Sequence, residues 1–308
     1  MKNIKKILVI IQRSNGDVFL SHSLISALYE YYQEPQIDLL VNDDTLPVAR
    51  LMPNIRLIHS FSYKKKHENN LNQEKKIISS VFRKYDLSIN LTASDRSVLY
   101  AVFASKNSIS AIEKKTGKSW WKKLLLNNYY FFDTSKHILL NNLEPLNLLK
   151  IKHTNILSKP KVSEKIIATI KYKLFKKGIK DFIIFHPSAQ YNYKIYPQHL
   201  RNELLSHLSG LDISVVITGG NNYIDTLIKQ ELPVLSNVFD FMGETTLEEY
   251  FALSEISLAY VGMDTLNMHI ASAQNKRIFT IFGPTNLTMW SPWSNQLLKS
   301  ATEDKPPQ

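Results

Sequence analysis

The chain has 308 residues, of which 44% are hydrophobic and 21% charged. This composition is typical of a globular protein, and the length predicts two domains of roughly 150 residues each. It contains no cysteine, which excludes disulfides, thiolate metal sites and thiol catalysis. The net charge of +11 favours an anionic partner, such as nucleic acid, a phosphorylated substrate or a membrane surface, although abundant lysine also fits an ordinary solvated surface.

The N-terminal half alternates predicted strands with helices. Residues 7–11 form an apolar run with polar residues on either side, which is typical of a buried parallel strand. The run is far shorter than the ~20 residues of a membrane span, and no small-residue cleavage site follows, so it predicts the first strand of a cytoplasmic protein. A glycine-containing loop and a helix follow, and further strands are predicted at 36–43, 55–61, 86–92 and 107–113. Between residues 120 and 158 the periodicity weakens, which indicates a closing helix and a linker.

The C-terminal half is a second alternating series. It begins with a basic helix over residues 163–178, in which Gly178 fits the C-terminal cap. Strands are then predicted at 181–189, 213–220, 238–243, 257–264 and 277–285. The two series predict two Rossmann-like, doubly wound parallel-sheet α/β domains, 1–158 and 159–308, which face a cleft lined by loops at the carboxyl ends of the strands.

The loop after the strand at 257–264 carries the densest group of candidate binding residues. Asp264 or Thr265 can cap the following helix, whose free N–H groups form a seat for a phosphate. His269 lies four positions beyond Thr265 and shares its helical face. The alternative is that these residues are only a cap and a packed helix residue. Gly283 and Pro284 fit a tight turn at the same sheet edge, where backbone can approach a ligand.

Two other loops of this half suit a nucleotide. Lys194 could neutralise a diphosphate as a point charge, or it could be an exposed lysine in a polar turn. Gly219 and Gly220 at a strand end permit close approach to a nucleotide, and Asp225 is a candidate ribose partner.

Asp17, in the loop after the first strand, is the candidate catalytic residue. A carboxylate there could take a proton from a sugar hydroxyl as a general base, or it could only cap the next helix. The loop lacks the spaced glycines of a dinucleotide fingerprint, and the chain has no GKS or GKT phosphate loop, which weighs against dehydrogenases and nucleotide hydrolases. No metal-binding carboxylate pair or histidine cluster is evident, so neither a metal nor another cofactor is expected.

Taken together, these loops resemble glycosyltransferase family 9, the ADP-heptose:lipopolysaccharide heptosyltransferases. The motifs span nearly the whole chain and are, in order, SNGDV, HPSAQYNYK, ITGG, MGETTLEEY, GMDTLNMHIASA, IFGPT and WSPW. The most specific group is the Asp-Thr pair with a His four residues later and the FGPT turn, which the family has in its donor-binding domain. The resemblance implies a GT-B fold with an acceptor-binding N-terminal domain and a donor-binding C-terminal domain.

The resemblance also implies roles for individual residues. Asp17 matches the catalytic base. The implied donor-binding residues are Ser188 and Lys194 at the diphosphate, Asp225 at the ribose, Met242 and Gly243 at the adenine, and Asp264, Thr265 and His269 in the donor-sugar and phosphate loop. The strand-end glycines Gly219 and Gly220, and Leu266 and Asn267 at the start of the predicted helix, complete the predicted donor-binding set. The chain departs from the family pattern in two places. Many members have a second hydroxyl residue where this chain has Ala189, and Gly-Pro or Gly-Leu where it has Leu266 and Asn267. These departures leave the donor sugar open.

The implied reaction is an inverting, metal-independent transfer of heptose from ADP-heptose to the anionic lipopolysaccharide inner core. Such an acceptor implies a cytoplasmic protein peripherally associated with the inner face of the cytoplasmic membrane. Alternatives are another nucleotide-sugar-dependent glycosyltransferase or a nucleotide-sugar epimerase of GT-B architecture, and a nucleotide- or polyanion-binding module. The basic clusters lack interleaved stacking aromatics, so no nucleic-acid partner is expected.

Overall fold

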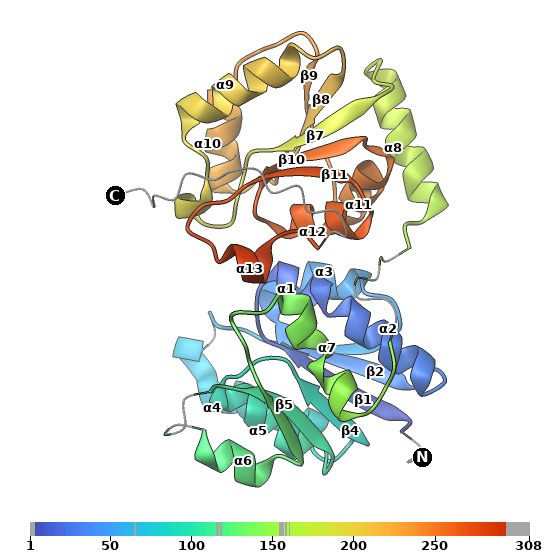
Figure 1. The fold of residues 1–308 in the computed structure, drawn as a ribbon, viewed down its shortest axis with the longest axis vertical. Helices are drawn as coiled ribbons and strands as arrows, with labels where there is room; N and C mark the ends of the chain where they lie inside the picture. The colour runs from blue at the N-terminus through green and yellow to red at the C-terminus, as the bar shows by residue number, and fades with distance from the viewer. Residues whose placement is uncertain are drawn as a thin grey trace. The chain divides into compact units, whose positions relative to one another are not determined.

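The structure is a computed structural model of the chain, and it describes residues 4–64, 66–114, 117, 119–153, 157, 159 and 161–293. The chain divides into two compact units, Met1–Pro160 and Lys161–Gln308 (Figure 1). This division lies two residues beyond the predicted boundary at 158. The assignment of acceptor binding to the first unit and donor binding to the second stays a prediction.

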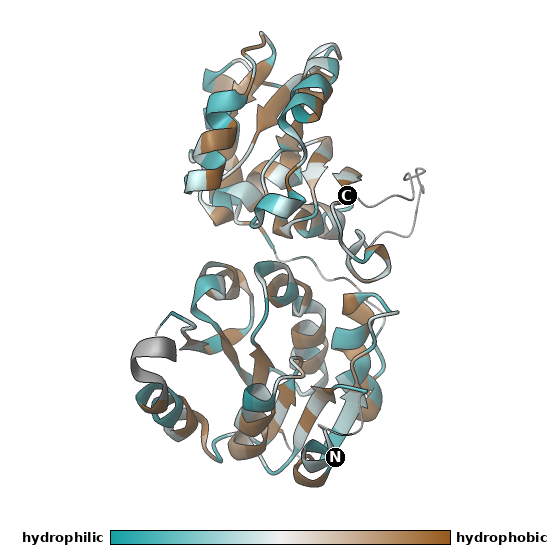
Figure 2. Ribbon diagram, turned by 90° about the vertical axis from the view of Figure 1, so that its left-hand side faces the viewer, coloured by the Kyte–Doolittle hydropathy of each residue, from teal (hydrophilic) through white to brown (hydrophobic). Residues whose placement is uncertain are grey.

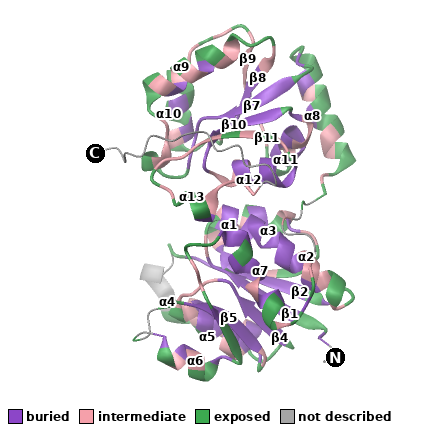
Figure 3. Ribbon diagram, in the orientation of Figure 1, coloured by how far each residue is buried: buried purple, intermediate pink, exposed green. Residues whose placement is uncertain are grey.

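The first unit contains a six-stranded parallel sheet with the order β3-β2-β1-β4-β5-β6. Its strands are β1 (Lys6–Ile11), β2 (Gln36–Asn42), β3 (Ile55–Phe61), β4 (Leu87–Asn90), β5 (Ser108–Ile112) and β6 (Asn128–Phe131). The central strands β1, β4 and β5 are almost entirely buried (Figure 3), as expected of parallel strands covered on both faces. The strand order reverses between β1 and β4, and such a switch point is where open α/β sheets bind ligands.

Helices connect these strands and cover the sheet. They are α1 (Asn15–Leu20), α2 (His22–Tyr31), a short 3-10 helix (Asp43–Thr45), α3 (Leu46–Leu51), α4 (Lys66–Val81), α5 (Asp95–Ala104), α6 (Trp120–Leu125) and α7 (Ile138–Leu148). The predicted helix after β1 is interrupted at Ser21, whose hydroxyl donates to the Val18 carbonyl at 2.6 Å. One hydrophobic core of this unit includes Leu8, Tyr100 and Val81, which come from the sheet, α5 and α4.

The stretch after residue 120 differs from the prediction of one closing helix and a linker. It contains α6 and α7 with a strand, β6, between them, and β6 pairs in parallel with β5 at the edge of the sheet. Tyr130 is buried, whereas Tyr129 and Phe131 are exposed, which is the alternation of a strand with one covered face. A strand of four residues is too short for this alternation to stand out in the sequence.

The second unit contains a five-stranded parallel sheet with the order β11-β10-β7-β8-β9. Its strands are β7 (Phe182–His186), β8 (Ser214–Ile217), β9 (Val238–Asp240), β10 (Ala259–Met263) and β11 (Arg277–Ile281), and they confirm the five predicted strands. Its helices are α8 (Glu164–Lys176), a 3-10 helix η2 (Asn192–Lys194), α9 (Gln198–Ser209), α10 (Tyr223–Glu231), α11 (Leu247–Ile256), α12 (Leu266–Ala273) and α13 (Leu287–Trp290). The switch point of this sheet lies between β7 and β10.

Local sequence signals explain where several elements begin and end. Gly178 follows α8 with a φ of +72°, as expected of the predicted glycine cap, and Ile179 N–H donates to the Leu174 carbonyl at 3.0 Å. Hydrophobic stretches run along strands in both units, and the helices carry both hydrophobic and hydrophilic residues (Figure 2). In the described residues, no helix is both long and apolar enough to cross a membrane.

The two parallel sheets, whose strands alternate with helices along the chain, confirm the predicted α/β fold class.

Candidate active site

Asp17 lies in the first turn of α1, just beyond the carboxyl end of β1, and is 4% exposed. The Ser14 hydroxyl and backbone N–H donate to its Oδ2 at 2.7 and 3.2 Å, which closes a capping box at the start of α1. The Arg13 Nε lies 2.9 Å from Asp17 Oδ1. The carboxylate is therefore both a helix cap and a buried, oriented base candidate at the switch point of the first sheet.

Burial raises the pKa of the Asp17 carboxyl above its ordinary value, while the Arg13 charge and the hydrogen bonds from Ser14 oppose this increase. A general base is most effective when its pKa approaches the working pH, so the raised pKa suits the predicted role. Arg13 also lies over the Phe132 ring, 4.9 Å from the ring centroid. Arg13 was not among the predicted site residues, although a cation four positions from a carboxylate is a recognisable signal.

In the second unit, Lys194 and Asp264 form an ion pair of 3.0 Å between Nζ and Oδ2. Lys194 ends η2 in the loop after β7, and Asp264 directly follows β10, so the pair joins the two sides of the switch point. Lys194 is therefore a partly buried, paired cation rather than an exposed lysine, and its role at a diphosphate stays a prediction. A Cβ on Gly283 would lie 3.3 Å from the Tyr193 carbonyl, which means that the FGPT turn packs against the loop that carries Lys194.

Thr265, and not Asp264, is the N-terminal cap of α12. Its Oγ1 accepts a hydrogen bond from the Asn267 N–H at 3.3 Å. Leu266 is the first residue of α12, and His269 is buried further along the same helix. The backbone N–H groups at this helix start, next to the Lys194 ammonium, are the kind of group that binds phosphate in proteins.

His186, which the sequence analysis did not single out, connects three of these loops. It is the last residue of β7 and is buried. Its Nδ1 lies 3.0 Å from Thr218 Oγ1 and 3.0 Å from Asn267 Nδ2. Burial lowers the pKa of His186 to about 4, and the charge of Asp225 opposes this decrease only in part, so the imidazole is neutral at pH 7. A histidine that ends a buried strand and precedes a proline is the signal that could have found it.

The neutral, buried state of His186 predicts that the protein loses stability on acidification. The pKa falls from 6.5 to about 4 on folding, so between these pH values the unfolded chain binds a proton that the folded chain excludes. We expect this residue to lower the free energy of unfolding by roughly 3 kcal/mol between pH 7 and pH 4, measured by urea unfolding. His186→Gln should lose correspondingly less over the same range, whereas the exposed His207→Gln should behave as the wild type. Equal pH dependence in the wild type and His186→Gln would contradict the prediction.

The predicted nucleotide residues gather after β8 and β9. A Cβ on Gly219 would lie 2.5 Å from Met242 Cε, and one on Gly220 would lie 2.8 Å from Asp225 Oδ2, so glycine lets both side chains approach the loop. Gly243, with a φ of +76°, donates from its N–H to the Gly219 carbonyl at 3.0 Å. The structure therefore brings these five residues together.

Asp225 is buried in the first turn of α10, where Asn222 caps the helix and also donates to Asp225 Oδ2. Its Oδ1 has no hydrogen-bond partner within the part of the chain that the structure describes. Buried carboxylate oxygens are normally hydrogen-bonded, so this oxygen has the capacity to accept a ligand hydroxyl. Ser188 is likewise buried, in the loop directly after β7.

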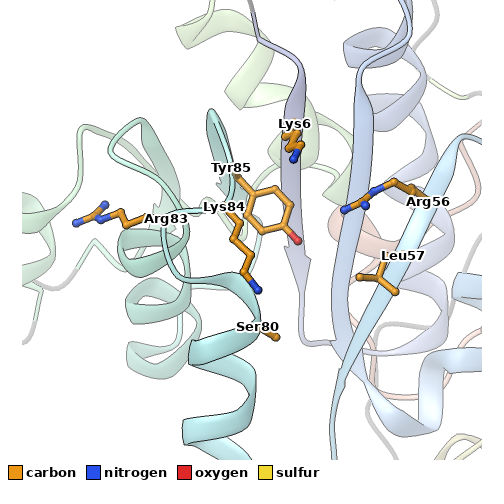
Figure 4. A pocket seen from close by; sticks show the side chains of 7 residues that line it. All are labelled: Lys6, Arg56, Leu57, Ser80, Arg83, Lys84 and Tyr85. Atoms are coloured by element: carbon orange, nitrogen blue, oxygen red, sulfur yellow. The ribbon is translucent and has the colours of Figure 1, made fainter.

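The first unit also contains a basic depression of about 490 Å³ at the other edge of its sheet (Figure 4), lined by Lys6, Arg56, Leu57, Ser80, Arg83, Lys84 and Tyr85. Arg56 donates two hydrogen bonds to buried Asp38, at 3.0 and 2.5 Å, and the Tyr85 hydroxyl donates to the same carboxylate at 2.7 Å. Lys6 begins β1, whereas Asp17 follows the end of that strand. The depression is therefore separate from the candidate active site.

Among the residues that the structure describes, no group of three or more His, Asp or Glu side chains is placed to hold a metal ion. Asp264 is already paired with Lys194, and Asp17 with Arg13. The expectation that protein cations act without a metal or other cofactor stays a prediction.

Comparisons with known proteins show the family and the fold class. The chain matches the family model described as glycosyltransferase family 9 (heptosyltransferase) over residues 75–307. It is 25% identical over 295 residues to lipopolysaccharide heptosyltransferase 3 of Escherichia coli. The aligned region covers 93% of this chain and 86% of that protein. Among solved structures, a glycosyl transferase family 9 protein of Veillonella parvula has a TM-score of 0.76 at 17% identity, covering 94% of this chain and 83% of that one. The E. coli ADP-heptose LPS heptosyltransferase II has a TM-score of 0.72 at 21% identity, covering 94% and 88%.

These similarities bear on the fold and on the class of protein. The structural neighbours include heptosyltransferases, and together with the two parallel-sheet units these confirm the predicted GT-B fold class. The family model covers more than half of the chain, including every donor-binding candidate, whereas Asp17 lies before its first matched residue. The chain is a glycosyltransferase and belongs to glycosyltransferase family 9, the heptosyltransferase family.

Proposed function

We propose that the protein transfers heptose from ADP-heptose to the inner core of lipopolysaccharide. Family membership and the E. coli relative named lipopolysaccharide heptosyltransferase 3 support this reaction. The observation that carries the proposal is the Lys194–Asp264 ion pair beside the start of α12, because a lysine cation next to a helix N-terminus is a setting that suits a diphosphate. The match to the transferase family favours transfer over the epimerase alternative.

The second unit holds the donor in this proposal. The adenine lies against Met242 and Gly243 beside the glycine pair, and a ribose hydroxyl donates to the unpartnered Asp225 Oδ1. The diphosphate lies at Ser188, Lys194 and the backbone N–H of Leu266 at the start of α12. Asp264, Thr265, Asn267 and His269 belong to the same donor-binding loop and helix. His186 fixes the Asn267 side chain, because the buried His186 ring is in hydrogen-bond contact with the amide group of the partly buried Asn267.

Asp17 acts as the general base. It takes the proton of an acceptor hydroxyl as that oxygen attacks the anomeric carbon, and the bond between this carbon and the phosphate oxygen breaks. ADP leaves with the bonding electrons, and Lys194 and the start of α12 stabilise its developing charge. A single displacement of this kind inverts the anomeric configuration.

The acceptor is anionic and embedded in a membrane, so the protein works at the inner face of the cytoplasmic membrane as a peripheral protein. The net charge of +11 supports this location, because the anionic leaflet attracts basic proteins.

The experiment that tests the function combines the purified protein with ADP-heptose and heptose-deficient lipopolysaccharide. ADP release and the acceptor mass are followed, and we expect a gain of one heptose that depends on both substrates. Turnover of donor alone to an isomer would favour an epimerase. Tight ADP-heptose binding without transfer would overturn the acceptor assignment, and failure to bind ADP-heptose would overturn the donor.

A further inference from the structure

The short helix α6 buries a lysine and exposes its apolar residues. Lys122 is 1% exposed, and its Nζ lies 2.8 Å from Asp95 Oδ1, Glu113 Oε2 and the Ala93 carbonyl oxygen. Trp120 and Leu124, by contrast, are 62% and 74% exposed. The helix is therefore held by a buried lysine that pairs with two exposed carboxylates, and its apolar residues Trp120 and Leu124 face solvent.

The neighbouring edge strand β6 extends this apolar surface. Tyr129 and Phe131 point to the same face, with ring centroids 5.8 Å apart, and both are exposed. The Lys123 ammonium lies 5.9 Å and 5.3 Å from the centroids of these two rings. This cation connects α6 with β6. We call the exposed residues of these two elements, Trp120, Leu124, Leu125, Tyr129 and Phe131, together with the partly exposed Lys123, the α6–β6 surface.

The composition of the α6–β6 surface indicates what it contacts. Large exposed apolar patches mark interaction sites on soluble proteins. Tryptophan and tyrosine favour the headgroup level of a bilayer, leucine favours the acyl boundary, and lysine favours anionic lipid phosphates. The α6–β6 surface combines all three kinds of side chain.

We propose that the α6–β6 surface docks the protein on an anionic bilayer. The inference rests on the proposed function, because a lipid-anchored acceptor must be reached from the membrane surface. Trp120, Leu124 and Leu125 enter the headgroup region, and Lys123 contacts lipid phosphates. Lys122 and the partly buried Trp121, which packs against Val98 and Ile112, keep α6 attached to the protein.

The test measures binding of the full chain to vesicles in the absence of any acceptor. Sedimentation compares vesicles of phosphatidylglycerol and phosphatidylethanolamine with vesicles of phosphatidylcholine. We expect the wild type to prefer the anionic vesicles, and Trp120→Ser/Leu124→Ser to bind them at least about 10-fold more weakly, since each side chain contributes apolar burial. Both residues are exposed, so the variant should fold normally.

A matched control is Tyr172→Ser/Phe175→Ser on α8, where two exposed aromatic residues also lie near a lysine, with Lys176 4.6 Å from the Tyr172 ring centroid. On that helix Lys173 and Lys177 are paired with Glu249 and Glu244, so we expect unchanged vesicle binding. Equal losses in the two variants, unchanged binding of Trp120→Ser/Leu124→Ser, or no binding by the wild type would overturn the proposal. So would a wild-type dimer that this variant dissociates without any change in vesicle binding, because the surface would then contact a second copy.

Activity measurements separate this proposal from the proposed function. Trp120→Ser/Leu124→Ser should transfer normally to a deacylated, soluble acceptor and poorly to acceptor embedded in vesicles. If the wild type transfers to neither acceptor but still binds anionic vesicles through this surface, the function is wrong and the docking surface stands.

Discussion

Replacing Asp17 by alanine is expected to lower kcat at least about 100-fold, within the roughly 10²- to 10⁴-fold contribution of a general base. The buried carboxylate is the only group of its loop that the proposal uses to take the acceptor proton, and alanine cannot accept one. Loss of the capping box should cost only about 1 kcal/mol of stability, so the variant should fold and bind ADP as the wild type does. Steady-state transfer assays and ADP titrations measure both effects.

Asp17→Asn is the matched control for the capping role. Asparagine can still accept hydrogen bonds from Ser14 at the start of α1, but it is not a base. Equal loss of kcat in the alanine and asparagine variants is expected. Full activity of Asp17→Asn would show that this side chain only caps the helix.

The pH dependence gives an independent readout of the same carboxylate. Asp17 must be ionised to accept a proton, so kcat/KM should fall as the pH decreases through its pKa, which burial raises above 3.8. Arg13 is the strongest influence that lowers this pKa, so Arg13→Met should move the acid limb to higher pH. A shift to lower pH, or none, would contradict the assignment of this limb to Asp17.

Replacing Lys194 by methionine is expected to lower kcat/KM by about 10²- to 10³-fold, as the loss of one preorganised donor to a developing negative charge does in other enzymes. The substitution removes the cation proposed for the ADP diphosphate. It also leaves the buried Asp264 carboxylate without its partner, and this charge would repel the diphosphate. Transfer kinetics and calorimetric titration with ADP report both consequences.

The double variant Lys194→Met/Asp264→Asn separates the two consequences. It removes both charges, so stability should return towards the wild-type value while kcat/KM stays low. Recovery of activity in the double variant would mean that Lys194 only neutralises Asp264 and does not act on the leaving group.

Local signals in the sequence were sufficient for most of the fold and for part of the site. Buried strands appear as short apolar runs, and the Gly178 cap and the Ser14–Asp17 capping box involve residues within a few positions of one another. The order of the motifs along the chain was sufficient to identify the family, because each motif lies in one loop after a strand and can be recognised within a few neighbouring residues. These features depend on neighbours along the chain, which the sequence contains directly.

Features that depend on distant partners were decided only by the tertiary structure. The Lys194–Asp264 pair and the contact of His186 with Asn267 join residues 70 and 81 positions apart, so no spacing rule predicts them. The strand β6 and the buried Lys122 were missed for the same reason. A four-residue edge strand is stabilised by pairing with β5, and a lysine becomes buried only where Asp95 and Glu113 supply compensating charges. Burial and ion pairing are properties of the folded sheet, and the linear sequence specifies them only through that fold.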